Sequence, residues 1–156
     1  MNKIFLFIFA LFLITGCGFK VVDDSKRNFS IESVNTTSNI NRLNYLIKKN
    51  LNKINSSSGK IPLQINLNLQ LEKNIYEEDN NKIITKYALI LKTNAVITNN
   101  DTKQIIDKFT ITHQVVYNKN SSRSTNIKTE QKLYETLSMD TTNSIFQKIK
   151  NKLNDI

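Results

Sequence analysis

The sequence predicts an α+β fold, a two-layer sandwich in which two helices pack on one face of a four-stranded, mostly antiparallel sheet. Two patterns carry this prediction. Apolar residues recur at three- and four-residue spacing over residues 40–54 and again over residues 126–154, as on one face of a helix. Over residues 61–117 apolar and polar residues alternate instead, and polar turns interrupt the alternation. The expected order is therefore strand, helix, three antiparallel strands and a long helix.

The first strand and the first helix open the predicted domain. Residues 29–34 alternate in polarity, which predicts a short strand. Ser38 is the expected N-cap of the helix, because a serine hydroxyl can accept a hydrogen bond from the first turn. The polar run at 55–59 ends this helix. Its apolar stripe consists of Ile40, Leu43, Ile47, Leu51 and Ile54.

Three strands follow, and their odd-numbered residues are predicted to face the helices. The alternation is clearest over residues 61–71, where leucine and isoleucine hold the odd positions and glutamine or asparagine most of the even ones. A polar turn at 77–81 and another at 99–101 separate the next strands, residues 82–98 and 105–117. The inward residues of these two strands are Ile83, Tyr87, Leu89, Leu91, Ile97, Ile105, Phe109, Ile111, Val115 and Tyr117.

The last segment predicts a long helix whose apolar face is narrow and interrupted by small residues. Thr141 occupies that face between the larger residues, which indicates a close approach to a neighbouring element. The apolar residues in helical register are Ile127, Leu133, Leu137, Ile145, Ile149 and Leu153.

The N-terminus has the pattern of an export signal. A basic start precedes an apolar run from Ile4 to Ile14, which is too short to span a membrane, since a spanning helix needs ~20 residues. Leu13-Ile14-Thr15-Gly16-Cys17 then resembles the bacterial lipobox, in which small residues precede a cysteine that is lipidated. We therefore expect residues 1–16 to be a cleaved signal peptide, 17–28 a lipidated N-terminus and tether, and 29–156 one α+β domain.

Composition excludes several classes of active site. The chain of 156 residues has one cysteine, one histidine and three glycines, too few for an internal disulfide, a His/Cys zinc site or a glycine-rich phosphate loop. His113 fits a core or boundary histidine with one hydrogen bond better than a metal ligand. The acidic run at 77–79 fits a solvated turn better than a calcium loop. We therefore expect no metal, no cofactor and no catalytic residue.

The positive charge is concentrated in two places. The formal net charge is +9, and residues 38–54 carry four basic residues and no acid. Lys86, Lys92 and Lys108 fall on even strand positions, so they share the face opposite the helices with many amides. These lysines are either ordinary solvated residues or ligand-binding residues for an anionic partner. Export excludes nucleic acid as that partner, and phosphorylated lipids, above all lipopolysaccharide, are the abundant anions in the periplasm.

The start Gly16-Cys17-Gly18-Phe19 and the order of elements that follows resemble the lipopolysaccharide-assembly lipoproteins of the LptE type. Because Gly18 rather than Asp follows the cysteine, the lipobox resembles that of lipoproteins sorted to the outer membrane and facing the periplasm. The resemblance implies a two-helix, four-stranded sandwich, anchored by acyl chains such as palmitate, that sits as a plug in an LptD-type β-barrel and helps deliver lipopolysaccharide to the outer leaflet. An auxiliary lipoprotein of an ABC-type lipid transporter and a pilotin-like secretin chaperone are the alternatives.

Overall fold

The computed structural model describes residues 28–55 and 59–154. The elements are β1 (Phe29–Ser38), α2 (Asn41–Ile54), β2 (Ile61–Glu78), β3 (Ile84–Asn99), β4 (Ile105–Asn118) and α3 (Arg123–Asn154). They form one four-stranded sheet in the order β1-β2-β3-β4. β1 pairs with β2 in parallel, and the other two pairings are antiparallel. The predicted fold class and element order are confirmed.

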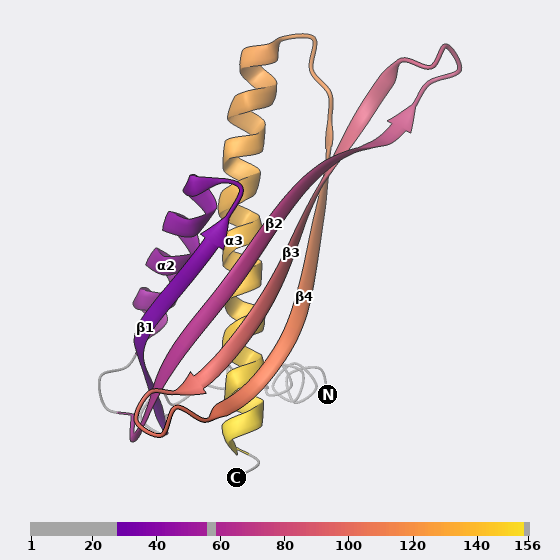
Figure 1. The fold of residues 1–156 in the computed structure, drawn as a ribbon. Coiled ribbons are helices and arrows are strands. Elements are labelled where there is room, and N and C mark those ends of the chain that lie inside the picture. The colour runs from indigo at the N-terminus through magenta and orange to yellow at the C-terminus, as the bar shows by residue number, and fades with distance from the viewer. Residues whose placement is uncertain (1–27, 56–58, 155–156) are drawn as a thin grey trace, which may run out of the picture.

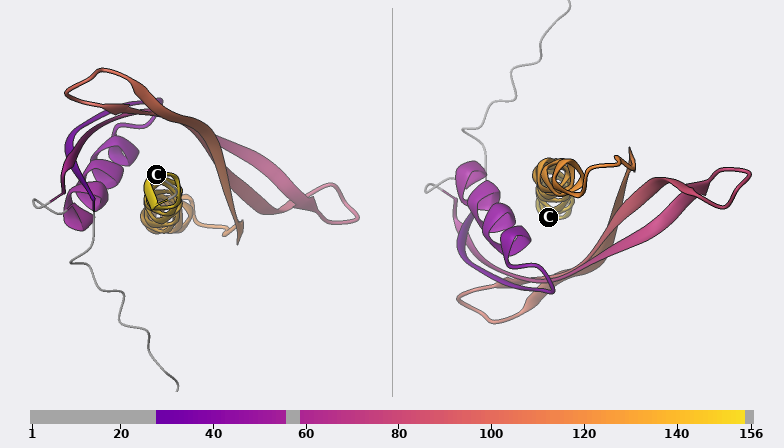
Figure 2. Two further views of the ribbon diagram at one scale, coloured as in Figure 1. Left: turned by 90° about the horizontal axis from the view of Figure 1, so that it is seen from below. Right: turned by 90° about the horizontal axis from the view of Figure 1, so that it is seen from above.

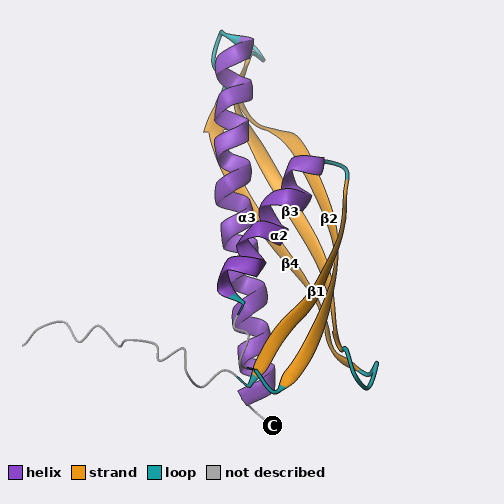
Figure 3. Cartoon of the chain, turned by 90° about the vertical axis from the view of Figure 1, so that its left-hand side faces the viewer, coloured by secondary structure: helices purple, strands orange, loops and turns teal. Residues whose placement is uncertain are grey.

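The sheet is strongly curved, and both helices lie on its concave face (Figure 2). α3 runs along the length of the sheet, whereas the shorter α2 covers the part beside β1 (Figure 1). The two helices also pack on each other (Figure 3). Beyond the end of β1, β2 and β3 continue as a hairpin that projects away from the helices (Figure 1). The helices therefore cover one face of the sheet and leave the convex face open.

The core is made by the odd-numbered strand residues and the predicted helical stripes. Each fully buried aliphatic side chain contributes roughly 1.5–3 kcal/mol through the hydrophobic effect, so this cluster dominates the stability of the domain. Its members with less than 2% of their surface exposed include Leu43, Ile47, Leu51, Leu63, Ile65, Leu69, Leu89, Leu91, Ile97, Leu137 and Ile145.

The end of α2 lies beside the start of β1. The Asn55 side chain donates to the Ile31 carbonyl at 2.6 Å and accepts from the Ile31 N–H at 2.7 Å. The connection to β2 is equally close, because a Cβ on Gly59 would lie 1.9 Å from the Phe29 carbonyl carbon. Only glycine avoids this clash with the backbone. The point where the preceding chain enters the domain is thus next to the C-terminal end of α2.

The start of α2 differs from the prediction that Ser38 caps it. The helix begins at Asn41 with Ile40 at the N-cap position, and no side chain caps it. Ser38 belongs to β1, and its hydroxyl accepts the Ile40 N–H at 2.9 Å. The Asn39 side chain bonds both the N–H and the carbonyl of Leu71, so it extends the β1–β2 ladder by one step. Pairing with β2 extends β1 past the predicted boundary and moves the helix start along the chain.

Three residues predicted to face the core are about half exposed instead: Ile83 at 56%, Ile105 at 54% and Ile127 at 46%. Ile83 lies in the β2–β3 turn, ahead of β3. Near Ile105 a register shift between Ile97 and Thr98 breaks the alternation, and Ile106 packs against the core instead. Ile127 lies in the first turns of α3, far from α2. A strict period of two cannot anticipate a bulge or the end of a strand.

The small residues of α3 lie where the two helices meet. Ser138, Thr141 and Thr142 are at most 2% exposed. Asn50 of α2 donates to the Ser138 hydroxyl at 3.2 Å, and the Thr142 hydroxyl donates to the Ser138 carbonyl at 2.7 Å. The predicted close approach of the last helix to a neighbour is confirmed, and that neighbour is α2.

Candidate functional site

The open face of the sheet carries a shallow groove rich in amides. Cross-strand hydrogen bonds join Asn35 to Asn66 at 2.9 Å and Thr110 to Asn94 at 2.8 Å, so the amides are partly ordered by each other. The groove has a volume of about 290 Å³. It is lined by Asn35, Thr36, Thr37, Asn66, Leu67, Asn68, Asn94 and Val96.

Lys92 and Lys108 lie exposed on the open part of the sheet, as their even positions predict. Lys92 of β3 pairs with Thr112 of β4, and Lys108 pairs with Val96. The two levels are four residue steps apart along β3, about 14 Å, since a strand rises ~3.4 Å per residue. Neither side chain has an ion-pair partner among the described residues. Two free cations at this spacing suit separate anionic groups on one ligand better than a single phosphate.

Lys86 is placed differently from the other two predicted ligand-binding lysines. Its ammonium forms a 2.6 Å ion pair with Glu77 on the facing strand of the projecting hairpin. This contact raises the pKa of Lys86 above its usual 10.5, chiefly through the hydrogen bond to Glu77. Lys86 also lies six residues from Lys92 along β3, about 20 Å at ~3.4 Å per residue. The structure therefore does not bring the three lysines into one cluster.

The open face also carries apolar side chains, which the prediction of a polar and basic face did not include. Ile90 and Val96 are half-buried, and Val116 is 36% exposed. All three occupy even strand positions, so the signal was present in the sequence. The convex face is consequently mixed in polarity, with amides near β1 and β2 and lysines interleaved with aliphatic residues on β3 and β4.

The two other sequence candidates have ordinary structural surroundings. His113 is half-buried on β4, and its Nε2 lies 3.1 Å from the Ser144 hydroxyl of α3, as expected for a boundary histidine with one hydrogen bond. The acidic run is predicted to be a solvated turn, but Glu77 and Glu78 are the last residues of β2, and only Asp79 lies in the β2–β3 turn. There the Asp79 carboxylate accepts the N–H groups of Asn81 and Ile83 at 2.9 and 2.8 Å.

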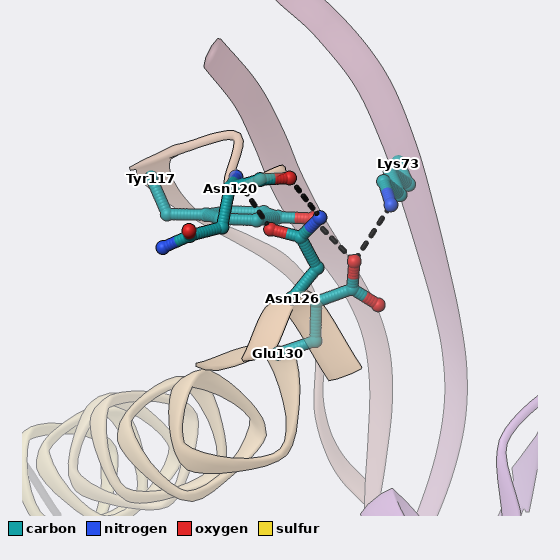
Figure 4. Close-up of polar contacts among 5 residues, drawn as sticks. All are labelled: Lys73, Tyr117, Asn120, Asn126 and Glu130. Atoms are coloured by element: carbon teal, nitrogen blue, oxygen red, sulfur yellow. Dashed lines mark hydrogen bonds and ion pairs between the residues drawn. The ribbon is translucent and has the colours of Figure 1, made fainter. Parts of the chain in front are cut away.

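A polar cluster that the sequence analysis did not anticipate joins the first turns of α3 to the sheet (Figure 4). The Glu130 carboxylate accepts hydrogen bonds from the Tyr117 hydroxyl and from the Lys73 ammonium, the latter at 2.6 Å. The Lys73 ammonium also lies 4.2 Å from the centre of the Tyr87 ring, and the Tyr87 and Tyr117 rings are 5.8 Å apart. These four residues come from β2, β3, β4 and α3, so no local sequence pattern could have revealed the cluster.

The pKa values of this cluster follow from burial and mutual contact. Burial alone would raise the pKa of Glu130, but the hydrogen bonds from Lys73 and Tyr117 outweigh it and lower the pKa below 4.5. Burial likewise opposes the shift at Lys73, whose pKa is nevertheless raised by Glu130 and Tyr117. Burial and the bond to Glu130 raise the pKa of Tyr117 to about 12. At neutral pH the cluster therefore holds one carboxylate, one ammonium and one neutral phenol.

The projecting hairpin presents large apolar residues to solvent. Ile75 and Tyr76 of β2 are 55% and 56% exposed, and Ile83 follows them across the turn. β1 ends opposite Leu69, and only the Asn39 side chain continues the ladder, to Leu71. The first strand therefore leaves this part of β2 without a neighbour on one side. Exposed apolar residues on a projecting hairpin are typical of a contact surface for another protein.

Two kinds of feature are absent from the described residues. Over residues 28–55 and 59–154, no helix combines the length and the hydrophobicity that a membrane span requires. The same residues hold no group of three or more His, Cys, Asp or Glu side chains placed to bind a metal ion. The predicted lipidation site, Cys17, lies outside the described residues.

The fold closely matches those of several solved bacterial lipoproteins. Rare lipoprotein B from Shewanella oneidensis superposes with a TM-score of 0.60 at 13% identity, over 79% of this chain and 97% of that chain. The minor lipoprotein from Acinetobacter baumannii gives 0.59 at 15% identity, over 82% and 92%. A lipoprotein from Caulobacter crescentus gives 0.55 at 15% identity, over 78% and 90%. At these identities the likeness establishes a shared fold.

Comparisons of sequence alone gave no match. No family model matches the chain, and neither does any curated protein. The structural likeness is thus carried by the order, pairing and packing of the elements.

Proposed function

We propose that this protein is a lipid-anchored lipoprotein of the outer membrane that acts as plug and assembly factor of a lipopolysaccharide-export barrel. In this role it has no catalytic activity. It binds the barrel through its folded domain and helps pass lipopolysaccharide into the outer leaflet. The acyl chains on Cys17 hold the domain at the membrane, facing the periplasm.

The observation that carries the proposal is the match of nearly the whole domain to rare lipoprotein B, joined to the lipobox at Cys17. The order of elements in that shared fold is also part of the resemblance to the LptE-type lipoproteins, together with the N-terminal motif. The lipobox and the fold come from different parts of the chain. Two independent features thus favour one role.

The surfaces of the domain are consistent with a place inside a barrel. Barrel lumens are polar and hydrated, and the amide-rich groove of the open sheet face can exchange hydrogen bonds with such a wall. The exposed apolar residues Ile75, Tyr76 and Ile83 on the hairpin provide a contact that a purely polar plug would not have. A plug needs both adaptable polar contacts and a few apolar anchors.

Co-purification tests the barrel partner directly. The lipidated protein, extracted with a mild detergent, is expected to elute with an outer-membrane β-barrel protein, and its depletion should reduce mature barrel and surface lipopolysaccharide. Elution with a periplasm-spanning lipid-transport complex or a secretin, together with unchanged surface lipopolysaccharide, would show that the proposal is wrong.

Charge reversal tests the predicted ligand-binding lysines. The double variant Lys92→Glu/Lys108→Glu should bind lipid A at least about tenfold more weakly, because two charge-assisted contacts are replaced by repulsion. Lys128→Glu/Lys132→Glu on the exposed face of α3 changes the net charge equally and serves as the matched control. Equal binding of both double variants would identify Lys92 and Lys108 as ordinary solvated lysines.

Lys86 needs a different variant because it is paired. In Glu77→Lys/Lys86→Glu the ion pair is kept but its polarity is reversed. If the Lys86 ammonium contacts the ligand, the exchanged variant should lose as much lipid A affinity as Lys86→Glu alone. Full affinity in the exchanged variant would assign Lys86 to the hairpin structure instead.

A further inference from the structure

The outward face of α2 is a second basic surface, separate from the open sheet face. It lies on the side of the helix opposite Leu43, Ile47 and Leu51, which are completely buried. Its residues form an open depression of about 490 Å³. We refer to them as the α2 patch: Tyr45, Lys48, Lys49, Asn52 and Lys53.

The charges of the α2 patch are unpaired within the described part of the chain. None of its three lysines forms one of the ion pairs found among residues 28–55 and 59–154. α2 contains no acidic residue, and the one ion pair it forms within residues 28–55 and 59–154 joins Arg42, outside the patch, to Glu135 of α3. Tyr45 is 63% exposed, and the Lys49 ammonium lies 5.8 Å from its ring centre. A solvated helix face would ordinarily mix both signs of charge.

The position of the α2 patch relative to the N-terminal tether suggests its partner. The hydrogen bonds between Asn55 and Ile31 place the C-terminal end of α2 beside the point where the tether enters β1. Residues 18–28 separate this point from Cys17, and eleven residues reach at most about 40 Å when fully extended. α2 has 14 residues and is about 21 Å long, so all of it lies within reach of a membrane that holds the acyl chains.

We propose that the α2 patch docks the domain on anionic phospholipid headgroups of the membrane that holds its anchor. This inference rests on the lipid anchor of the proposed function, and it adds a surface that the role of barrel plug does not require. Phosphates pair with the lysines, and the exposed Tyr45 ring enters the interfacial region, where aromatic residues with a polar group are favoured. Before the domain enters the barrel, the acyl chains keep it at the membrane, and the patch determines which side faces the headgroups.

The test uses the whole lipidated chain in vesicles. Since the thiol of Cys17 is consumed by lipidation, Asn52→Cys introduces the only free thiol and can carry a nitroxide in the centre of the patch. In vesicles with 30% phosphatidylglycerol, the collision rate of this nitroxide with a water-soluble nickel complex should fall at least about threefold relative to pure phosphatidylcholine, since each lysine favours the anionic surface about fivefold. Salt at 0.5 M should reverse the effect.

Two controls keep the experiment interpretable. A nitroxide at Gln131→Cys, exposed on α3 and outside the patch, should respond equally little in both vesicles. Lys48→Glu/Lys49→Glu/Lys53→Glu should abolish the response at position 52. Lys119→Glu/Lys128→Glu/Lys132→Glu, with the same charge change on other exposed lysines, should preserve it.

Equal collision rates in the two vesicle types overturn the proposal. Protection that appears only when a co-purifying envelope protein is added also overturns it, because the partner is then an acidic protein surface. The mass of the reconstituted chain separates these outcomes from a failure of the anchor. A chain without acyl mass contradicts the proposed function, whereas an acylated chain with an unresponsive patch contradicts only the docking surface.

Discussion

The two ends of the sandwich are held together by different physical interactions. At the end where α2 and α3 both cover the sheet, the contacts are apolar, and residues such as Ile47 and Leu91 are completely buried. At the end where α3 alone meets the sheet, Glu130 of α3 bonds the Lys73 ammonium and the Tyr117 hydroxyl, and large apolar residues remain exposed. Stability is thus concentrated in the two-helix end, and the single-helix end is the part suited to contact with a partner.

The largest expected effect tests the apolar end. Leu91→Ala should lower the free energy of unfolding by about 3–5 kcal/mol, because it leaves a cavity in the centre of the core. Ile75→Ala on the projecting hairpin should change it by less than about 0.5 kcal/mol. Urea unfolding measures both values, provided that the dependence of the unfolding free energy on urea concentration is the same in both variants. Similar losses in the two variants would show that stability is spread evenly along the sheet.

Removing the carboxylate at the centre of the polar cluster should have the next largest effect. Glu130→Ala should lower the free energy of unfolding by about 1–2 kcal/mol, since Lys73 and Tyr117 lose a shared, charge-assisted partner. The Lys73 side chain is 41% exposed, so screening by water keeps the effect in this range. Glu135→Ala, which breaks the exposed pair with Arg42, should cost less than about 0.5 kcal/mol. An equal loss in the two variants would contradict a special role for the cluster.

A stabilising substitution is expected within the core. Thr93 is completely buried, and its hydroxyl has no hydrogen-bond partner among the residues that the structure describes. Thr93→Val should therefore raise the free energy of unfolding by about 1 kcal/mol, because a buried hydroxyl without a partner has lost its hydration. Thr142→Val serves as the control and should give no gain, because its hydroxyl bonds the Ser138 carbonyl. Destabilisation by Thr93→Val in the same urea experiment would contradict the structure around this hydroxyl.

The smallest predicted effect is the pH dependence of the polar cluster. Because the pKa of Glu130 is lowered in the folded protein, its stabilisation is complete above 4.5 and is lost as the pH falls through the folded value. The difference in the free energy of unfolding between the wild type and Glu130→Gln, measured with urea, should accordingly shrink by roughly a few tenths of a kcal/mol between pH 6 and pH 3. A difference that grows toward low pH would reverse the assigned direction of the shift.

Much of the fold could be predicted because period and burial are local properties of the sequence. The apolar residues that alternate over 61–71 form the buried face of β2, and the stripe from Leu43 to Leu51 forms the buried face of α2. The small residues around Thr141 indicated a close contact before its partner was known. These features repeat every few residues, so a short stretch of sequence is enough to indicate which side of a helix or strand is buried.

The candidate sites were only partly predictable. Even positions placed Lys92 and Lys108 on the open face, but the distances between them and the pairing of Lys86 with Glu77 depend on strand register. The contact of Lys73, Tyr117 and Glu130 joins residues up to 57 positions apart. No local pattern encodes such a contact, because it requires the sheet to be twisted and α3 to be packed on it.

The sequence by itself determined the class of the fold, the buried faces of its elements and the basic character of residues 38–54, and it predicts a lipobox at Cys17. The tertiary structure decided that Ser38 extends a strand rather than capping a helix, that Ile105 faces solvent, and which of the lysines stand unpaired. It also placed the basic face of α2 beside the entry of the tether. The physical reason is one of range: hydrophobic periodicity is fixed by neighbours along the chain, whereas register, bulges and ion pairs depend on residues that only folding brings together.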